Sequence, residues 1–141
     1  MIYGIGVDCT TIERFNEWPS YSHEKLLKVF TRSELQEGFD SDKTAHLPTF
    51  FASRFAVKEA FYKALSNLLL HHHNPFKPIS FATCRQAVEV AKNNLGIPQL
   101  IINWKTIEKE CGVSLPALFS HLSLSHEKNM AVAFVILEKQ I

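Results

Sequence analysis

The sequence carries almost no net charge. Its 15 Lys and Arg residues are balanced by 14 Asp and Glu residues, which leaves a formal charge of +1 over 141 residues. A protein that coats nucleic acid needs a strong basic excess, so nucleic acid is excluded as a partner. The sequence also lacks internal repeats, low-complexity tracts and linkers. We therefore expect a single domain over residues 1–141, long enough to bury a core without disulfides or a structural metal.

Cysteine is scarce, and long apolar runs are absent. Cys9, Cys84 and Cys111 form an odd set without C-x-x-C spacing, which indicates neither a disulfide framework nor a zinc site. The longest apolar run, residues 130–137, is too short to span a bilayer. The N-terminus has neither the basic nor the apolar segment of a signal peptide. These absences predict a cytoplasmic protein in a reducing compartment, with no membrane partner.

What the sequence does contain is a helical stretch, residues 50–65, that is apolar on almost every side yet carries four charges. Glu59 and Lys63 lie one turn apart, and Arg54 and Lys58 form a second i, i+4 pair on an adjoining flank. A helix of this kind is buried on most sides, so its charges must be paired, solvated in a cleft, or bound to a metal or ligand. One acid among three bases favours a polyanion held together with a cation. Two solvated ion pairs are the alternative.

The N-terminal stretch, residues 2–8, alternates with period two and predicts a strand. One of its faces holds only Gly4, Gly6 and Asp8. Glycines inside a strand mark a bulge or a place where a ligand or another backbone comes close, and here they leave space beside a carboxylate. Asp8 is therefore a candidate ligand, with a turn or capping role as the alternative.

Two Thr-x-x-Glu patterns predict helix starts. The first, residues 10–13, predicts a short helix that ends at Pro19 and leaves Arg14 solvated. The second, residues 31–34, predicts another helix start, preceded by a helix over residues 24–30. Thr49 is expected to cap the long central helix.

The second half of the sequence predicts mainly strands. The long helix should end at the histidine run, residues 71–73, whose members point in different directions and do not indicate a metal site. Strands are expected at 79–81, 87–91, 99–103, 122–126 and 130–137, with a small helix at 105–111 that Gly112 closes. Residues 84–95 also fit helical spacing, so the second of these strands stays open between a strand and a helix.

Residues 130–137 are apolar on both faces, which indicates a central strand. The predicted order of elements is one strand, then helices, then further strands. This order predicts an α+β fold rather than alternating βαβ units.

Several blocks in this order resemble holo-acyl-carrier-protein synthase, the small bacterial type of 4′-phosphopantetheinyl transferase. The blocks are Gly-Ile-Gly-Val-Asp at 4–8, Ile-Glu-Arg-Phe at 12–15, Thr-Arg-Ser-Glu-Leu at 31–35, Arg-Phe-Ala-Val-Lys-Glu-Ala-Phe-Tyr-Lys-Ala at 54–64, Gly-Ile-Pro at 96–98 and Ser-Leu-Ser-His at 123–126. The resemblance implies transfer of 4′-phosphopantetheine from coenzyme A to a serine of apo acyl carrier protein, for fatty acid biosynthesis. It also implies Mg²⁺ dependence and a homotrimer with sites between subunits, and it leaves open whether Mn²⁺ can replace Mg²⁺.

The resemblance also assigns roles to particular residues. It implies Asp8 and Glu59 as metal ligands, which act in catalysis with Lys63. It implies Arg54, Lys58, Lys63, Ser125 and His126 as coenzyme-binding residues, and Arg14 as a docking residue for the acidic carrier protein. The group that accepts the serine proton stays open between Glu59 and a network of metal-bound water.

The chain departs from the family pattern in three places. Residues 68–73 replace the usual glycine-rich loop, and residues 82–86 and 104–116 are longer than usual. Two other functions remain as alternatives: a catalytically silent homologue that binds coenzyme A or a carrier protein, and a small nucleotide-binding hydrolase.

Overall fold

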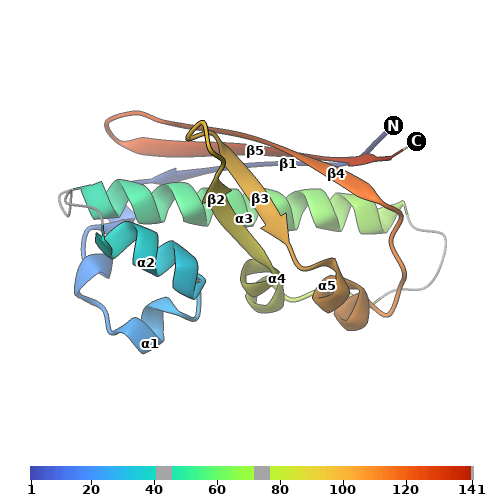
Figure 1. Cartoon of the computed structure of the whole chain (residues 1–141), viewed down its shortest axis with the longest axis horizontal. Helices are drawn as coiled ribbons and strands as arrows, with labels where there is room; N and C mark the ends of the chain where they lie inside the picture. The colour runs from blue at the N-terminus through green and yellow to red at the C-terminus, as the bar shows by residue number, and fades with distance from the viewer. Residues whose placement is uncertain (41–45, 72–76, 141) are drawn as a thin grey trace.

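The computed structural model describes residues 1–40, 46–71 and 77–140. A long helix, α3 (Leu47–Leu70), lies along one face of a three-stranded antiparallel sheet (Figure 1). The sheet has the order β1 (Ile2–Thr11), β5 (Met130–Lys139), β4 (Leu118–His126). The apolar strand β5 is central, as the sequence predicts. The mixture of helices and antiparallel strands confirms the α+β prediction. No helix among the described residues has the length and hydropathy needed to cross a membrane.

Most of the remaining elements lie on the side of α3 that faces away from the sheet, whereas the hairpin of residues 88–102 crosses α3 and contacts β4 (Figure 1). The remaining elements are η1 (Glu13–Phe15), η2 (Trp18–Ser20), α1 (His23–Leu26), α2 (Arg32–Asp40), α4 (Phe81–Ala87), β2 (Val88–Lys92), β3 (Pro98–Ile102) and α5 (Trp104–Cys111). Strands β2 and β3 form the expected hairpin, which settles the open reading in favour of a strand. Gly112 closes α5 with a φ of 70°, also as expected. Because α3 is covered on both sides, 15 of its residues are buried.

The glycine face of β1 is occupied by another backbone. Gly4 and Gly6 are buried against α3, and a Cβ on either would clash with a helix carbonyl, that of Ala64 or Ala60. The space that the sequence leaves beside Asp8 is therefore filled by the helix, not by a ligand. This close approach brings the end of β1 within reach of side chains on α3.

The opposite face of the sheet is apolar and exposed. Ile5 and Val7 of β1 pair with Ile136 and Phe134 of β5, and Val7 and Phe134 are 51% and 39% exposed. We call Ile5, Val7, Val132 and Phe134 the outer sheet face. Within the described part of the chain no helix or strand covers it (Figure 1). A contiguous apolar surface of this kind is typical of an interface with another protein chain.

The two Thr-x-x-Glu patterns have different outcomes. At residues 31–34 the capping box forms: the Thr31 amide donates to Glu34 Oε2 over 2.9 Å, and the Glu34 amide donates to Thr31 Oγ1 over 3.2 Å. At residues 10–13 the prediction is wrong, because Thr10 and Thr11 extend β1 and pair with β5. Only a short 3₁₀ turn follows, and no side chain caps it.

Two further expectations about element boundaries are wrong, and the expected end of the long helix at the histidine run is confirmed. Helix α3 begins at Leu47, with Pro48 in its first turn, so Thr49 is inside the helix and does not cap it. The strand expected at 79–81 is absent, because Ser80 caps α4 by accepting a hydrogen bond from the Thr83 amide. His71 follows the last residue of α3, whereas the other two histidines of the run lie outside the described residues.

Candidate active site

Asp8 and Lys63 meet where β1 crosses α3. The Lys63 Nζ lies 2.9 Å from Asp8 Oδ1 and also donates to the Val7 carbonyl over 3.0 Å. The close packing of the glycine face against α3 makes this contact between strand and helix feasible. The two side chains therefore face one another although 55 residues separate them.

Glu59 belongs to the same group of charges. It lies one turn before Lys63 on α3, and its pKa is raised, first by burial and then by the negative charge of Asp8. The positive charges of Lys63, Arg14 and Arg85 oppose this shift. The structure thus brings together Asp8, Glu59 and Lys63, which we call the carboxylate site. No sequence motif indicated Arg85 at this place.

Arg14 borders the carboxylate site from the turn η1. Its guanidinium carbon lies 4.6 Å from the ring centroid of Phe55 and 5.6 Å from that of Phe15. The residue is exposed, as expected, but it stacks on an aromatic ring of α3 instead of pointing freely into water. A charge held in this way can meet a partner that approaches the site.

The two carboxylates fit a hard divalent cation. Magnesium prefers oxygen ligands and commonly uses one or two carboxylates together with phosphates of the substrate. The described residues contain no group of three or more His, Cys, Asp or Glu that could hold an ion by themselves. Glu59 is close enough to Asp8 for that residue's negative charge to raise its pKa, and a cation at the site would offset this charge. The site therefore fits a metal whose remaining ligands come from the substrate.

Besides the carboxylate site, the structure has a pocket on another flank of α3, with a volume of about 570 Å³. Arg54 and His126 line it together with Glu37, Gly38, His46, Leu47, Thr49, Phe50, Ser53, Lys92, Pro98 and Leu124. We call it the Arg54 pocket. Ser125 is exposed but is not among the lining residues. Of the residues that the resemblance assigns to the coenzyme, two therefore share this cavity.

The Arg54 side chain is fixed on two sides. Its Nη2 lies 3.1 Å from Glu37 Oε1, and its guanidinium carbon is 4.0 Å from the Phe50 ring centroid. Burial lowers the pKa of Arg54, and the charge of Glu37 opposes this shift. Its Nε is buried and has no hydrogen-bond partner among the described residues. A buried donor without a partner is costly, which favours an acceptor from a ligand.

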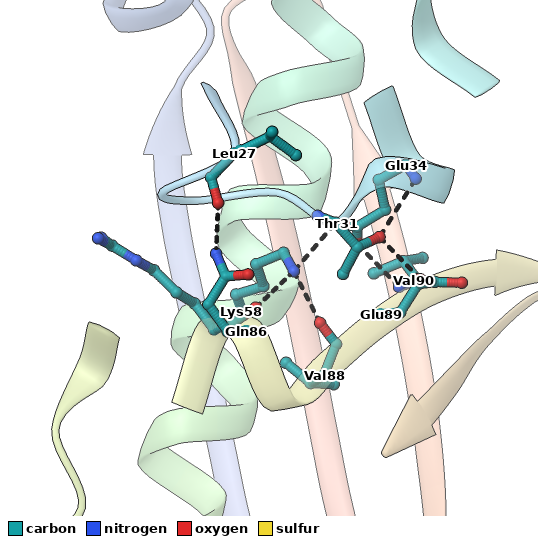
Figure 2. A network of polar contacts seen from close by, with 9 residues as sticks. Leu27, Thr31, Glu34, Lys58, Gln86, Val88, Glu89 and Val90 are labelled. Carbon is teal, nitrogen blue, oxygen red and sulfur yellow. Dashed lines mark hydrogen bonds and ion pairs between the residues drawn. The ribbon is translucent and has the colours of Figure 1, made fainter. Parts of the chain in front are cut away.

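Lys58 does not fit its expected role at the phosphates of coenzyme A. Its side chain is 0% exposed, and its Nζ lies 3.0 Å from Glu34 Oε2 (Figure 2). The same nitrogen donates to the carbonyls of Arg85 and Val88, over 2.8 and 2.7 Å. Burial lowers the pKa of Lys58, and the charge of Glu34 opposes that shift. With three acceptors in the protein interior, this lysine joins α3 to neighbouring elements and does not reach a ligand.

Glu34 is the centre of the buried network that holds Lys58 (Figure 2). Its Oε1 accepts from the Val90 amide over 2.9 Å, and its Oε2 accepts from the Thr31 amide. The Thr31 hydroxyl donates in turn to Glu89 Oε2 over 2.7 Å. One carboxylate therefore connects α2, α3 and β2. The sequence indicated only its capping role, because the other partners lie 24 and 56 residues away.

We expect Glu34→Ala to lower the free energy of unfolding by about 3–5 kcal/mol, because it leaves a buried ammonium without its counterion. Urea denaturation followed by circular dichroism measures this loss. As a control, Lys92→Ala removes the more exposed Lys92–Glu37 pair, at 3.3 Å, and should change stability by less than about 1 kcal/mol. Equal small losses for both variants would contradict a structural role for the buried pair.

The carboxylate site and the Arg54 pocket lie on different flanks of α3. Arg54 and Glu59 are five residues apart, which places their side chains roughly 140° apart around the helix axis. In the sheet, Asp8 is on β1 and His126 is on β4, with β5 between them. The chain thus holds the two groups of predicted residues on separate surfaces.

The chain is similar to known proteins along almost its whole length. A model of the 4′-phosphopantetheinyl transferase superfamily matches residues 4–133. The chain is 40% identical over 140 residues to a holo-[acyl-carrier-protein] synthase of Geotalea daltonii, covering 99% of this chain and 100% of that protein. It is 37% identical, with the same coverage, to a protein of that name from Geobacter sp.. The crystal structure of a holo-(acyl-carrier-protein) synthase from Bacillus anthracis in complex with CoA (3′,5′-ADP) matches with a TM-score of 0.71 and 28% identity, over 99% of both chains.

Proposed function

This chain belongs to the 4′-phosphopantetheinyl transferase superfamily, and from that membership we propose that it acts as a holo-acyl-carrier-protein synthase. It transfers the 4′-phosphopantetheine group of coenzyme A to a serine of apo acyl carrier protein and releases adenosine 3′,5′-bisphosphate. This step serves fatty acid biosynthesis. The observation that carries the proposal is the meeting of Asp8, Glu59 and Lys63, residues far apart in the sequence, within a chain of this family.

Asp8 and Glu59 would hold Mg²⁺, or Mn²⁺ in its place, at the pyrophosphate of the coenzyme. When bound, such an ion neutralises phosphate charge and orients the pyrophosphate for attack. The serine oxygen forms a bond to the phosphorus that carries the pantetheine arm, and the bond from that phosphorus to the leaving bisphosphate breaks. Lys63 stabilises the negative charge that develops on the leaving group. The serine proton passes either to Glu59 or to water at the site.

The Arg54 pocket would receive the nucleotide end of coenzyme A. Arg54 carries a buried donor without a partner, and His126 lies on the wall of the same cavity. Both side chains can donate hydrogen bonds to phosphate oxygens. Ser125 precedes His126 and would contribute from the rim. Lys58 is left out of this proposal, since its ammonium is enclosed by protein acceptors.

A single coenzyme molecule can use both groups of residues if they come from neighbouring subunits. The carboxylate site of one chain would then face the Arg54 pocket of the next. The outer sheet face supplies the apolar surface that such an assembly needs. A closed ring of three subunits has one heterologous interface per chain and one complete site at each. We therefore favour a homotrimer, in the cytoplasm, where the three free cysteines stay reduced.

We expect Arg14→Glu to act on the carrier protein and not on the coenzyme. Acyl carrier proteins are acidic, so a cation beside the carboxylate site should promote encounter and docking, an effect that salt screens. The apparent KM for the carrier protein should rise about tenfold, and its dependence on salt should flatten. Steady-state kinetics at several salt concentrations measure both changes. Equal losses toward coenzyme A and the carrier protein would place Arg14 elsewhere in the mechanism.

The central experiment incubates the protein with coenzyme A, Mg²⁺ and a purified apo acyl carrier protein. Intact-mass spectrometry should show the carrier protein gaining one phosphopantetheine group, and chelation of the metal should stop the gain. A silent homologue would bind its ligands without this mass change. A hydrolase would consume the coenzyme and leave the carrier protein unmodified. Either result would overturn the proposed function.

A further inference from the structure

Arg85 has a fixed backbone close to the carboxylate site. It belongs to α4, which Ser80 caps, and lies outside the sequence motifs that carry the family resemblance. Its carbonyl accepts a hydrogen bond from the buried Lys58 Nζ over 2.8 Å. Because Lys58 is enclosed by three acceptors, the end of α4 is tied to α3 one residue away from Glu59.

Aromatic contacts direct the Arg85 side chain toward the same place. Its guanidinium carbon lies 5.5 Å from the ring centroid of Phe81, one turn earlier on α4. Phe81 in turn contacts Phe55 and Tyr62, with centroid distances of 5.9 and 5.5 Å. These two residues of α3 lie one turn before and one turn after Glu59.

The Arg85 guanidinium lacks a partner that its chemistry requires. Its Nε is buried and has no hydrogen-bond partner among the described residues, and its side chain forms no ion pair with any of them. Lys63, by contrast, is already paired with Asp8. Leaving a buried donor unsatisfied costs about 1–3 kcal/mol. Such a cost is recovered when a ligand supplies an acceptor, and a guanidinium fork matches two phosphate oxygens.

We propose that Arg85 binds the pyrophosphate of coenzyme A at the carboxylate site, as a cation that reaches the ligand from α4. The inference rests on the proposed function, since it takes coenzyme A as the ligand. It adds a contact that the family motifs do not contain. Lys58 then acts as a positioning residue, because it holds the backbone from which Arg85 extends.

The test measures coenzyme binding without any turnover. Isothermal titration calorimetry with coenzyme A and Mg²⁺, in the absence of carrier protein, compares wild type with Arg85→Met, which keeps the apolar stem over Phe81 and removes the charge. We expect the Kd to rise at least about tenfold, the effect of losing one charge-assisted hydrogen bond. Arg85→Lys keeps the charge without the fork and should weaken binding severalfold. Lys109→Ala, an exposed cation of α5, is the matched control and should bind as wild type does.

A second ligand identifies the phosphate concerned. Coenzyme A without its 3′-phosphate retains the pyrophosphate, so Arg85→Met should weaken its binding by the same factor. If the loss disappears with this ligand, Arg85 binds the 3′-phosphate and the proposal is wrong. It is also wrong if Arg85→Met binds both ligands normally, or changes only the KM for the carrier protein. Circular dichroism verifies folding, and Arg85→Lys decides the question if Arg85→Met does not fold. Failure of the proposed function is seen separately, as wild-type protein that does not modify the carrier protein.

Discussion

Replacing Asp8 or Glu59 with alanine is expected to reduce kcat/KM for transfer about 100- to 1,000-fold. In the proposed mechanism, each change would leave the cation with one protein carboxylate, so the pyrophosphate would be held and neutralised less well when charge moves to the leaving group. Asp8→Ala also frees Lys63, whose Nζ is held 2.9 Å from Asp8 Oδ1. The rate of mass gain of the apo carrier protein, measured over a range of Mg²⁺ concentrations, gives the size of each effect.

Both variants should fold, because neither carboxylate takes part in the buried network around Glu34. Circular dichroism and thermal unfolding verify this. Glu110→Ala, which removes an exposed carboxylate at the end of α5, is the matched control and should keep wild-type activity. If Asp8→Ala or Glu59→Ala retained near-normal turnover at low Mg²⁺, the assignment of these residues to the metal would be abandoned.

Phe134→Asp is expected to convert an assembly of about three times the 16.1 kDa chain mass into single chains and to abolish transfer. Phe134 lies at the middle of the outer sheet face, paired with Val7 on one side and Ser123 on the other. A carboxylate buried in an apolar interface without a partner costs several kcal/mol per subunit, enough to disrupt a closed ring. Light scattering at micromolar concentration measures the mass. The control is Leu95→Asp, a change in the exposed turn between β2 and β3 that should leave mass and activity intact.

Mixing two inactive variants tests directly whether the sites are shared. Asp8→Ala removes part of the carboxylate site, and His126→Ala alters the Arg54 pocket. If one subunit supplies the first group and its neighbour the second, mixed assemblies contain some interfaces with both groups intact, and part of the activity should return. Each variant alone should stay inactive at the same total concentration. A monomeric mass with full activity would refute the shared site. A trimer without complementation would place both residues in one subunit's contribution.

The family resemblance singled out Asp8, Glu59 and Lys63, but the sequence could not show that Lys63 and Lys58 have different environments. Lys58 and Lys63 occur in one motif, on one helix, with similar apolar neighbours. Their environments differ because Lys58 meets Glu34 from α2 and two carbonyls near the start of β2, whereas Lys63 meets Asp8 on β1. These contacts arise only when distant segments pack. Helical spacing predicts the face of a charge, not the partners that the rest of the chain brings to it.

The two Thr-x-x-Glu patterns make the same point for local structure. Both have a threonine hydroxyl and a glutamate carboxylate at the sequence spacing of a capping box, and only the pattern at residues 31–34 forms a cap. At residues 10–13 the backbone instead continues the sheet, since Thr10 and Thr11 pair with Ala131 and Met130. Those ladder bonds satisfy backbone groups that a cap would otherwise serve. Pairing with a strand about 120 residues further along the chain therefore overrides the local capping pattern. A short window of the sequence does not contain that partner.

The pairing of β1 with β5 also affects the order in which parts of the protein fold. Ile2 pairs with Glu138, so the strand that carries Asp8 leaves the ribosome long before the strand that aligns it. Until β5 is synthesised, the edge of β1 has no partner in this sheet, because β5 is its neighbour there. Contacts of such wide sequence separation form slowly. The carboxylate site would therefore form late, after α3 and its aromatic contacts, and pulsed hydrogen exchange during refolding should find the β1 amides among the last to gain protection.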